Sequence, residues 1–486
     1  MSTNPLSELG RRTEAPPISW LMKLALERPR LISLAAGFTD HASLPVREAQ
    51  EVLDEILARS QSGQPALQYG STLGDPTLRR LTAERVQALD LGLVLPLDRR
   101  SKLQVERCGL AVEGLGSSCN RQLSTGNGSS TASSSERKQE SPRRCAGGVY
   151  SPERVIITAG SQQFLYMVTE ALCDRGDLVL VEDPTYFVYL GLVQSHGLRA
   201  RGVRLDSDGL DLAHLERLLD GLKRSGELRR LKLLYLVSYF QNPTGRTTGF
   251  EKKFRALELL RHYERAAGHP IYLLEDTAYR ELRFAGEGVK SALATGPRAE
   301  RVIYTGTYSK PFATGARVGF GFLPEPVFTA VERIKGNHDF GTTSLLQHLL
   351  ARVLASGRFD RHLADLRVRY ARKAAVMVRA VREHFPPEVE WQEPQGGLYV
   401  WARAPRSVRT GERSALFRAA LRHDVLYVPG QLCYADDPTR RKPDHEMRLS
   451  FGGATLADVR AGLAHLGEAM RDCWPGSSRR SAGSET

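Results

Sequence analysis

From Val155 onward, short runs of apolar residues alternate with longer stretches in which apolar residues recur at helical spacing. The short runs are typical of buried strands, and they lie at residues 155–158, 178–182, 233–237, 271–275, 302–305 and 318–322. Helical patterns, such as those at 164–172 and 254–267, lie between several of them. Apolar strands that alternate with helices predict an α/β fold, with a mainly parallel sheet covered on both faces.

The pattern changes after about Phe340. Helical spacing predicts helices at 344–355, 361–384 and 456–473, and strand-like pieces at 398–402 and 447–451 separate them. We interpret this part as a smaller α+β domain that the N-terminal arm joins. The predicted units are an arm with part of the small domain at 1–50, a large domain at 51–335, a small C-terminal domain at 336–475 and a disordered tail at 476–486.

One segment, at about 99–148, fits neither domain. It is polar, of low complexity and rich in glycine and serine, so it cannot bury enough apolar area to order itself. We interpret it as a flexible insertion, which loop entropy tolerates at small cost. Its sequence indicates no function.

Composition narrows the class of protein. A chain of 486 residues is long enough for two domains. It contains no apolar run of the roughly 20 residues that a membrane helix needs and no signal peptide at its start, which predicts a cytoplasmic protein. The six cysteines form no C-x-x-C pair, so we expect reduced thiols and no metal site.

The net charge of +13 raises nucleic acid as a partner. However, the arginines are spread along the chain, often between acids, and no DNA- or RNA-binding motif accompanies them. Solvated basic faces are the favoured interpretation, and a positive field also suits a cofactor phosphate and anionic substrates.

Candidate chemistry centres on G-T-Y-S-K, which ends at Lys310 after a predicted strand. A lysine at this position could form an imine with an aldehyde cofactor. Thr307, Ser309 and Arg317 could hold a phosphate beside it, the arginine through a forked contact. Taken alone, the motif is a weak signal, and a surface lysine is the favoured interpretation.

Two further strand ends carry suitable groups. Asp276 follows the run at 271–275 and could pair with a pyridine nitrogen, while Tyr279 and Asn242 could bond a ring hydroxyl. Each also has a plain interpretation, because an acidic strand end and Asn-Pro-Thr-Gly are both turn signals.

Upstream, T-A-G-S-Q-Q links a strand to a helix and places Ser161 and Gln162 at the helix N-terminus, where backbone N–H groups attract anions. Ser161 could instead only cap the helix. Tyr186, in D-P-T-Y, could stack on a planar ring or simply pack.

Six motifs, taken in their order along the chain, resemble those of class I/II aminotransferases of fold type I. They are G-S-Q-Q, E-D-P-T-Y, F-Q-N-P-T-G, E-D-T-A-Y-R-E-L, G-T-Y-S-K and A-R-V-G. The likeness is nearest to the subgroup of 2-aminoadipate, kynurenine, branched-chain and aromatic aminotransferases. Four flanking motifs agree with this resemblance, namely I-S-L-A-A-G, L-Q-Y-G-S-T-L-G, P-Q-G-G-L-Y-V-W and R-L-S-F. The resemblance spans about 18–466, apart from the insertion, and identifies 51–335 as the domain that binds pyridoxal phosphate (PLP).

The resemblance implies that Lys310 holds PLP as a Schiff base and that Asp276 pairs with its pyridine nitrogen. Asn242 and Tyr279 would bond the ring oxygen, and Tyr186 would stack on the ring. The phosphate would be bound by Ser161, Gln162, Thr307, Ser309 and Arg317.

For the substrate, the resemblance implies that Arg448 clamps the α-carboxylate and that Gly37 and Asn242 line its site. Tyr69 would act across the interface of a homodimer. Trp20 stands where relatives specific for dicarboxylates often carry an arginine, which favours a neutral or aromatic side chain.

We therefore expect a ping-pong aminotransferase that moves the amino group of an L-amino acid, whether neutral, aromatic or 2-aminoadipate-like, to a 2-oxo acid such as 2-oxoglutarate. A lyase, decarboxylase or synthase of the same fold is an alternative, because fold does not fix the reaction. An aminotransferase-like regulatory protein is another, but the family motifs begin by about Ile32 and leave little room for a preceding DNA-binding domain.

Overall fold

The computed structural model describes residues 5–93 and 148–474. The predictions for the tail at 476–486 and for the insertion at 99–148, apart from Gly148, lie outside the described residues.

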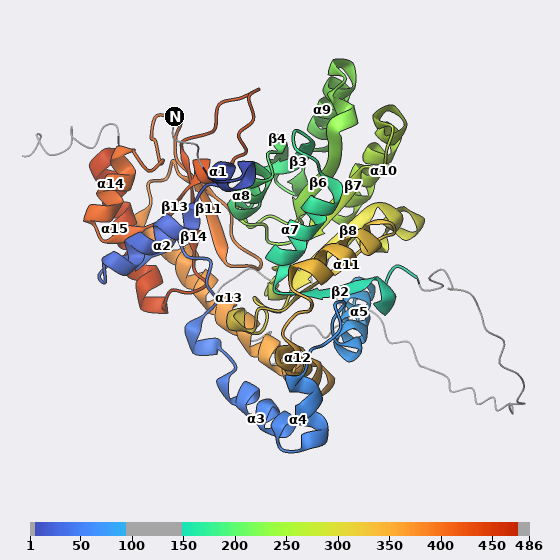
Figure 1. Cartoon of the computed structure of the whole chain (residues 1–486). Helices are drawn as coiled ribbons and strands as arrows, with labels where there is room; N and C mark the ends of the chain where they lie inside the picture. Colours follow the sequence, from blue (N-terminus) through green and yellow to red (C-terminus); the bar gives the residue numbers. More distant parts are fainter. Residues whose placement is uncertain (1–4, 94–147, 475–486) are drawn as a thin grey trace, which may run out of the picture.

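An eight-stranded sheet forms the centre of the larger part of the molecule (Figure 1). In chain order its strands are β2 (Val155–Thr158), β3 (Leu178–Asp183), β4 (Arg199–Asp206), β5 (Gly209–Leu210), β6 (Leu231–Val237), β7 (Tyr272–Asp276), β8 (Val302–Thr307) and β9 (Gly319–Phe322). They lie side by side in the order β2-β9-β8-β7-β6-β3-β4-β5. The neighbours from β4 to β8 are parallel, whereas β2, β9 and β5 pair in antiparallel fashion. The prediction of a mainly parallel sheet is confirmed.

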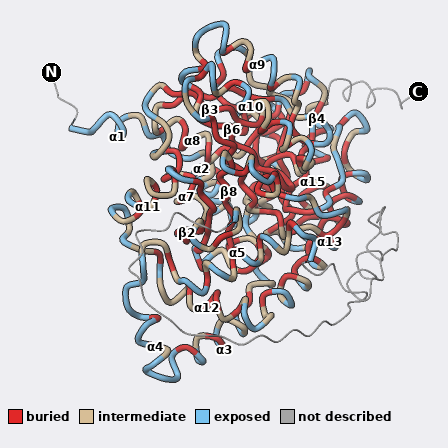
Figure 2. The backbone as a smooth tube through the Cα atoms, turned by 90° about the vertical axis from the view of Figure 1, so that its right-hand side faces the viewer, coloured by how far each residue is buried: buried red, intermediate tan, exposed pale blue. Residues whose placement is uncertain are grey.

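The strands are apolar because both faces of the sheet are covered. Five consecutive residues of β3, Leu-Val-Leu-Val-Glu, are buried although alternate side chains point to opposite faces. Figure 2 shows the buried backbone concentrated along β3, β6 and β8. The helices that accompany these strands are α7 (Ser161–Leu172), α8 (Phe187–Ser195), α9 (Leu212–Ser225), α10 (Phe250–Ala267) and α11 (Val327–His338).

A second, smaller sheet is antiparallel and has the order β10-β11-β14-β13. Its strands are β10 (Glu390–Trp391), β11 (Tyr399–Arg403), β13 (Val428–Pro429) and β14 (Glu446–Ser450). The N-terminal strand β1 (Ile32–Ser33) pairs with β12 (Val425–Leu426), so the start of the chain packs onto this part. The later helices are α12 (Ser344–Ala355), α13 (Arg358–His384), α14 (Ala415–Arg422) and α15 (Leu456–Cys473). The domain boundaries at 50, 335 and 475 stay predictions.

The N-terminal helices are α1 (Glu8–Arg12), α2 (Pro17–Glu27), α3 (Val46–Leu57), α4 (Ser60–Leu67) and α5 (Pro76–Leu91). Local sequence sets their ends. Asp75 caps α5 by accepting a hydrogen bond from the Leu78 N–H, Pro76 occupies the first turn, and Gly92 ends the helix in the left-handed conformation. Short 3₁₀ turns connect elements at His41–Ser43, Pro152–Arg154, Glu227–Arg230, Arg280–Leu282, Ala292–Arg301, Thr314–Ala316 and Gly430–Cys433.

The parallel strands decide where a ligand can bind. The carboxyl ends of β3, β6, β7 and β8 meet at one edge of the large sheet, and ligands in such sheets bind beyond this edge. Within 5–93 and 148–474, none of the helices combines the length and the apolar character needed to cross a membrane. The cytoplasmic location stays a prediction.

Candidate active site

A cavity of about 250 Å³ lies beyond the carboxyl ends of β6, β7 and β8 and is closed by residues of β11 and β14. It brings together every site residue predicted from the sequence except Tyr69. These residues are Gly37, Ser161, Gln162, Tyr186, Asn242, Asp276, Tyr279, Thr307, Ser309, Lys310, Arg317 and Arg448. We call it the active-site cavity.

The Lys310 amine lies in this cavity, just after β8, and donates a hydrogen bond to the carbonyl of Gly37 at 2.8 Å. Burial lowers the pKa of Lys310 to about 8, and the positive charges of Arg448 and Arg317 contribute to the decrease. A lysine in these surroundings is uncharged in a larger fraction of molecules near neutral pH. It is therefore a better nucleophile than a surface lysine.

Asp276 ends β7 and is 4% exposed. Its carboxylate accepts hydrogen bonds from the Tyr235 hydroxyl at 2.9 Å and from the Ala278 N–H at 3.1 Å. Burial raises the pKa of Asp276 to about 6 in spite of these bonds. Within the described residues it forms no ion pair, so it can accept a cationic partner, such as the protonated nitrogen of a ring.

The opposite end of the cavity is suited to a phosphate. Ser161 and Gln162 begin α7, where N–H groups without helical partners point outward. Arg317 lies beside them and donates a long hydrogen bond of 3.5 Å to the Ser309 hydroxyl. A side chain at Gly160 would place its Cβ 2.6 Å from the Arg317 guanidinium. Gly160 also has a φ of +79°, which other residues rarely adopt, so this backbone conformation, more than the contact with the flexible guanidinium, favours glycine there.

Arg448 on β14 is 1% exposed and has no carboxylate partner among the described residues. It donates to the side-chain oxygen of Asn242 at 2.7 Å and to the carbonyl of Ala35 at 2.6 Å, and its buried Nε has no partner. The guanidinium also lies over the rings of Tyr399 and Phe187, at 4.5 and 5.3 Å from their centroids. A buried guanidinium with neutral oxygens and rings but no carboxylate around it is costly unless an anion joins it. This arrangement fits a substrate carboxylate.

Two aromatic side chains complete the wall nearest to Arg448. The hydroxyls of Tyr279 and Tyr399 lie 3.0 Å apart. A Cβ at residue 37 would lie 2.5 Å from the Tyr399 hydroxyl, so Gly37 makes room for it. Tyr186 occupies the N-cap position of α8 without a capping hydrogen bond from its side chain, and burial raises its pKa, which keeps the phenol neutral.

Among the lining residues that sequence reasoning missed are Tyr399, Ile18 and Phe38. Tyr399 lies in P-Q-G-G-L-Y-V-W, so the motif was a usable signal. From α2 it is Ile18 that lines the cavity, whereas Trp20 stacks on Phe417 with ring centroids 5.8 Å apart. The expected preference for neutral or aromatic substrate side chains therefore rests on the apolar Ile18 and not, as the sequence suggested, on Trp20.

Tyr69 does not reach this cavity. It is 83% exposed and contacts Phe340 edge to face, with ring centroids 5.6 Å apart. Its predicted role across a subunit interface stays a prediction.

The fold is that of solved fold type I enzymes. Kynurenine aminotransferase of Pyrococcus horikoshii, solved in complex with PMP, matches with a TM-score of 0.77 and 25% identity, over 97% of this chain and 98% of that one. The architecture is that of a PLP-dependent transferase.

The sequence model of the aminotransferase class I and II family matches residues 137–466. The chain belongs to this family and is a PLP-dependent aminotransferase. It is 28% identical over 467 residues to aromatic-amino-acid aminotransferase 1 of Thermococcus litoralis, covering 96% of this chain and 94% of the relative. It is 29% identical over 462 residues to 2-aminoadipate transaminase of Thermus thermophilus, covering 95% of each. Amino acids and 2-oxo acids are accordingly its substrates.

Proposed function

We propose that this aminotransferase takes the amino group from L-amino acids with neutral, aromatic or 2-aminoadipate-like side chains. It passes the group to a 2-oxo acid such as 2-oxoglutarate, in two half-reactions that follow one another. The observation that carries the proposal is the cavity itself, where Lys310, Asp276 and Arg448 converge and apolar Ile18 and Phe38 form the side wall.

When bound, PLP supplies an aldehyde for the amino group and a ring that withdraws electrons from the substrate. We assign the ring end to Asp276, which would hold a proton at the pyridine nitrogen, and to Asn242 and Tyr279, which would bond the ring oxygen. Tyr186 would stack on the ring. The phosphate end is assigned to the group that surrounds the start of α7, namely Ser161, Gln162, Thr307, Ser309 and Arg317.

Arg448 binds the α-carboxylate of the amino acid and so fixes which of its bonds faces Lys310. The Lys310 amine, once free of the cofactor, would accept the α-proton of the amino acid and would then donate it to the cofactor carbon that carried the aldehyde. The closed wall of Tyr279 and Tyr399 limits the access of water during this transfer. The side chain of the substrate lies toward Ile18 and Phe38, which offer it no charge.

The proposal includes a homodimer. Three apolar or aromatic side chains are largely exposed: Leu67 at 69%, Tyr69 at 83% and Phe340 at 62%. A second copy of the chain that covered them would remove this apolar surface from water. Tyr69 would then complete the site of the partner, as the family resemblance implies. The mass of the protein in solution tests this part: a monomer with full activity contradicts it.

The first experiment is an absorbance titration of the cofactor-loaded protein with single amino acids, in the absence of any 2-oxo acid. Aromatic and neutral amino acids should convert the spectrum to that of the amino form of the cofactor, whereas aspartate should do so poorly. Release of a stoichiometric amount of 2-oxo acid provides an independent readout. A protein that shows no cofactor band after incubation with PLP contradicts the assignment of Lys310, and a band that no amino acid changes contradicts transamination by this chain.

A further inference from the structure

A second and larger cavity, of about 770 Å³, lies apart from the active-site cavity and shares no lining residue with it. Its walls come from the end of α5, from the loops at 239–247 and 280–290, from α13 and from the segment at 392–395. Its volume is within the range of cavities that bind small molecules. We call it the arginine cavity because of the side chains described below.

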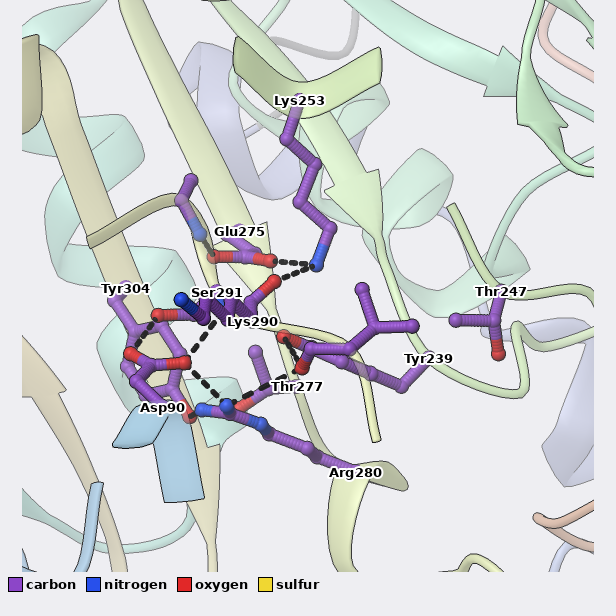
Figure 3. Close-up of polar contacts among 12 residues, drawn as sticks. Asp90, Tyr239, Thr247, Lys253, Glu275, Thr277, Arg280, Lys290, Ser291 and Tyr304 are labelled. Atoms are coloured by element: carbon purple, nitrogen blue, oxygen red, sulfur yellow. Dashed lines mark hydrogen bonds and ion pairs between the residues drawn. The ribbon is translucent and has the colours of Figure 1, made fainter. Parts of the chain in front are cut away.

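Many charged groups around the arginine cavity are already paired. Arg280 forms a buried ion pair with Asp90, whose carboxylate also accepts hydrogen bonds from the backbone and hydroxyl of Ser291 (Figure 3). Asp208 pairs with Lys252 at 2.6 Å, and Glu393 pairs with an arginine of α13. These carboxylates therefore do not neutralise the remaining arginines.

Three arginines of the lining, Arg246, Arg283 and Arg367, form no ion pair with any carboxylate in the described part of the chain. They donate only to backbone or side-chain oxygens without charge: the carbonyls of Leu205 at 3.2 Å, Gly286 at 2.5 Å and Glu281 at 2.8 Å are their best partners.

Their environment is unfavourable for cations. Burial lowers the pKa of Arg367 to about 10, with the positive charges of Arg283 and Arg85 adding to the decrease and Glu281 opposing it. Burial is also the largest cause of the lowered pKa values of Arg246 and Arg283. A bound anion would compensate these charges where water does so poorly.

The other unpaired charges on the lining are those of Glu287 and Lys290, which are exposed and of opposite sign. Glu287 acts on Arg283, whose pKa it raises against the larger effect of burial, and the charge of Lys290 adds to that of the arginines, so the lining keeps an excess of positive charge.

We propose that the arginine cavity binds a small polyanion with at least two phosphate or carboxylate groups. Each planar guanidinium can bind such a group through two parallel hydrogen bonds. The cavity has a volume several times that of one inorganic phosphate, which favours a ligand that carries several anionic groups.

The test is calorimetric titration of the cofactor-loaded protein with inorganic pyrophosphate and, separately, with citrate. The loaded protein is used because PLP occupies the phosphate end of the active-site cavity. Two variants remove the proposed contacts, Arg283→Gln and Arg246→Gln. The matched control is Arg379→Gln, which removes an exposed arginine of α13 outside the cavity.

The wild type and Arg379→Gln should bind at least one of the two anions in the millimolar range or tighter. Each cavity variant should weaken that binding about tenfold or more, as expected for the loss of one charge-assisted contact. Binding of pyrophosphate alone would identify phosphate chemistry, and binding of citrate alone carboxylate chemistry. The proposal is overturned if the wild type binds neither anion, or if all four proteins bind equally, because the anion then occupies another site.

Discussion

Two consecutive carboxylates on β7, Glu275 and Asp276, point to opposite faces of the sheet and meet opposite environments. Glu275 is completely buried and pairs with the equally buried Lys253 at 2.9 Å (Figure 3). Asp276, its neighbour, lies in the active-site cavity, and in the part of the chain that the structure describes its carboxylate has only a phenol and a backbone N–H for partners.

The two buried lysines differ in the same way. Lys253 has Glu275, the carbonyl of Lys290 and the ring of Tyr239 around its amine, and these contacts hold it in place. The Lys310 amine has one carbonyl as a partner and forms no ion pair with a carboxylate among the described residues. The comparison teaches that burial alone does not mark a reactive group. The absence of a matching counter-charge does, because it leaves the group available to a ligand.

The largest effect is expected for Lys310→Ala. This change removes the amine that binds the cofactor and moves the proton, so transamination should fall to the detection limit of a coupled assay. The fold should persist, as measured by circular dichroism, because the Lys310 side chain makes only one hydrogen bond within residues 5–93 and 148–474. Turnover close to that of the wild type would contradict the central assignment.

Asp276→Asn should lower kcat by about 10²–10³-fold, the usual cost of removing one well-placed electrostatic partner of a reaction. The matched change on the other face, Glu275→Gln, should retain most of kcat while it destabilises the fold. Steady-state kinetics with one aromatic donor separates the two. Equal losses of kcat in both variants would refute the division of roles between the faces of β7.

Lys253→Met should lower the free energy of unfolding by about 3–5 kcal/mol, because it leaves Glu275 charged and buried without a partner. Its chain neighbour provides the control: Lys252→Met breaks only exposed pairs with Asp206 and Asp208 and should cost at most about 1 kcal/mol. Urea denaturation measures both. A double variant, Lys253→Met with Glu275→Leu, should regain much of the loss.

The smallest expected effect is a shift in the pH dependence of cofactor uptake. The uncharged form of Lys310 reacts with PLP, so the rate at which the apoprotein takes up the cofactor should rise with pH and level off above the pKa of about 8. Arg448 disfavours the protonated amine; Arg448→Gln should therefore raise the pKa and move the midpoint to higher pH. Stopped-flow absorbance follows the reaction, and a midpoint that moves downward would contradict this electrostatic account.

The sequence predicted the strands and motifs that depend on neighbouring residues. Continuous apolar runs located β2 to the residue, because a strand buried on both faces contains few polar residues. β4 was missed because Arg199, Arg201 and Arg204 interrupt its apolar pattern. The order of motifs in the chain likewise identified the residues at the strand ends, which the parallel sheet then brings together.

The contacts that depend on distant segments could not be predicted. Lys253 follows another lysine in a charged stretch of α10, which is typical of a solvated face, and nothing local indicates its burial against Glu275. In the same way, Ile18 and Phe38 enter the active-site cavity because the N-terminal segment packs across it, and periodicity does not show where such a segment ends up.

The walls of the active-site cavity have a consequence for engineering. The wall that holds Asn242, Arg448 and Tyr399 is interlocked, because a bond joins the first two and Gly37 leaves no spare volume beside the third. Random substitutions in this wall should therefore disrupt the packing of the site before they alter its preference for one substrate over another. The wall of Ile18 and Phe38 comes from the N-terminal segment, where Phe38 is half exposed. A library restricted to these two positions can explore new donors while the chemistry stays intact.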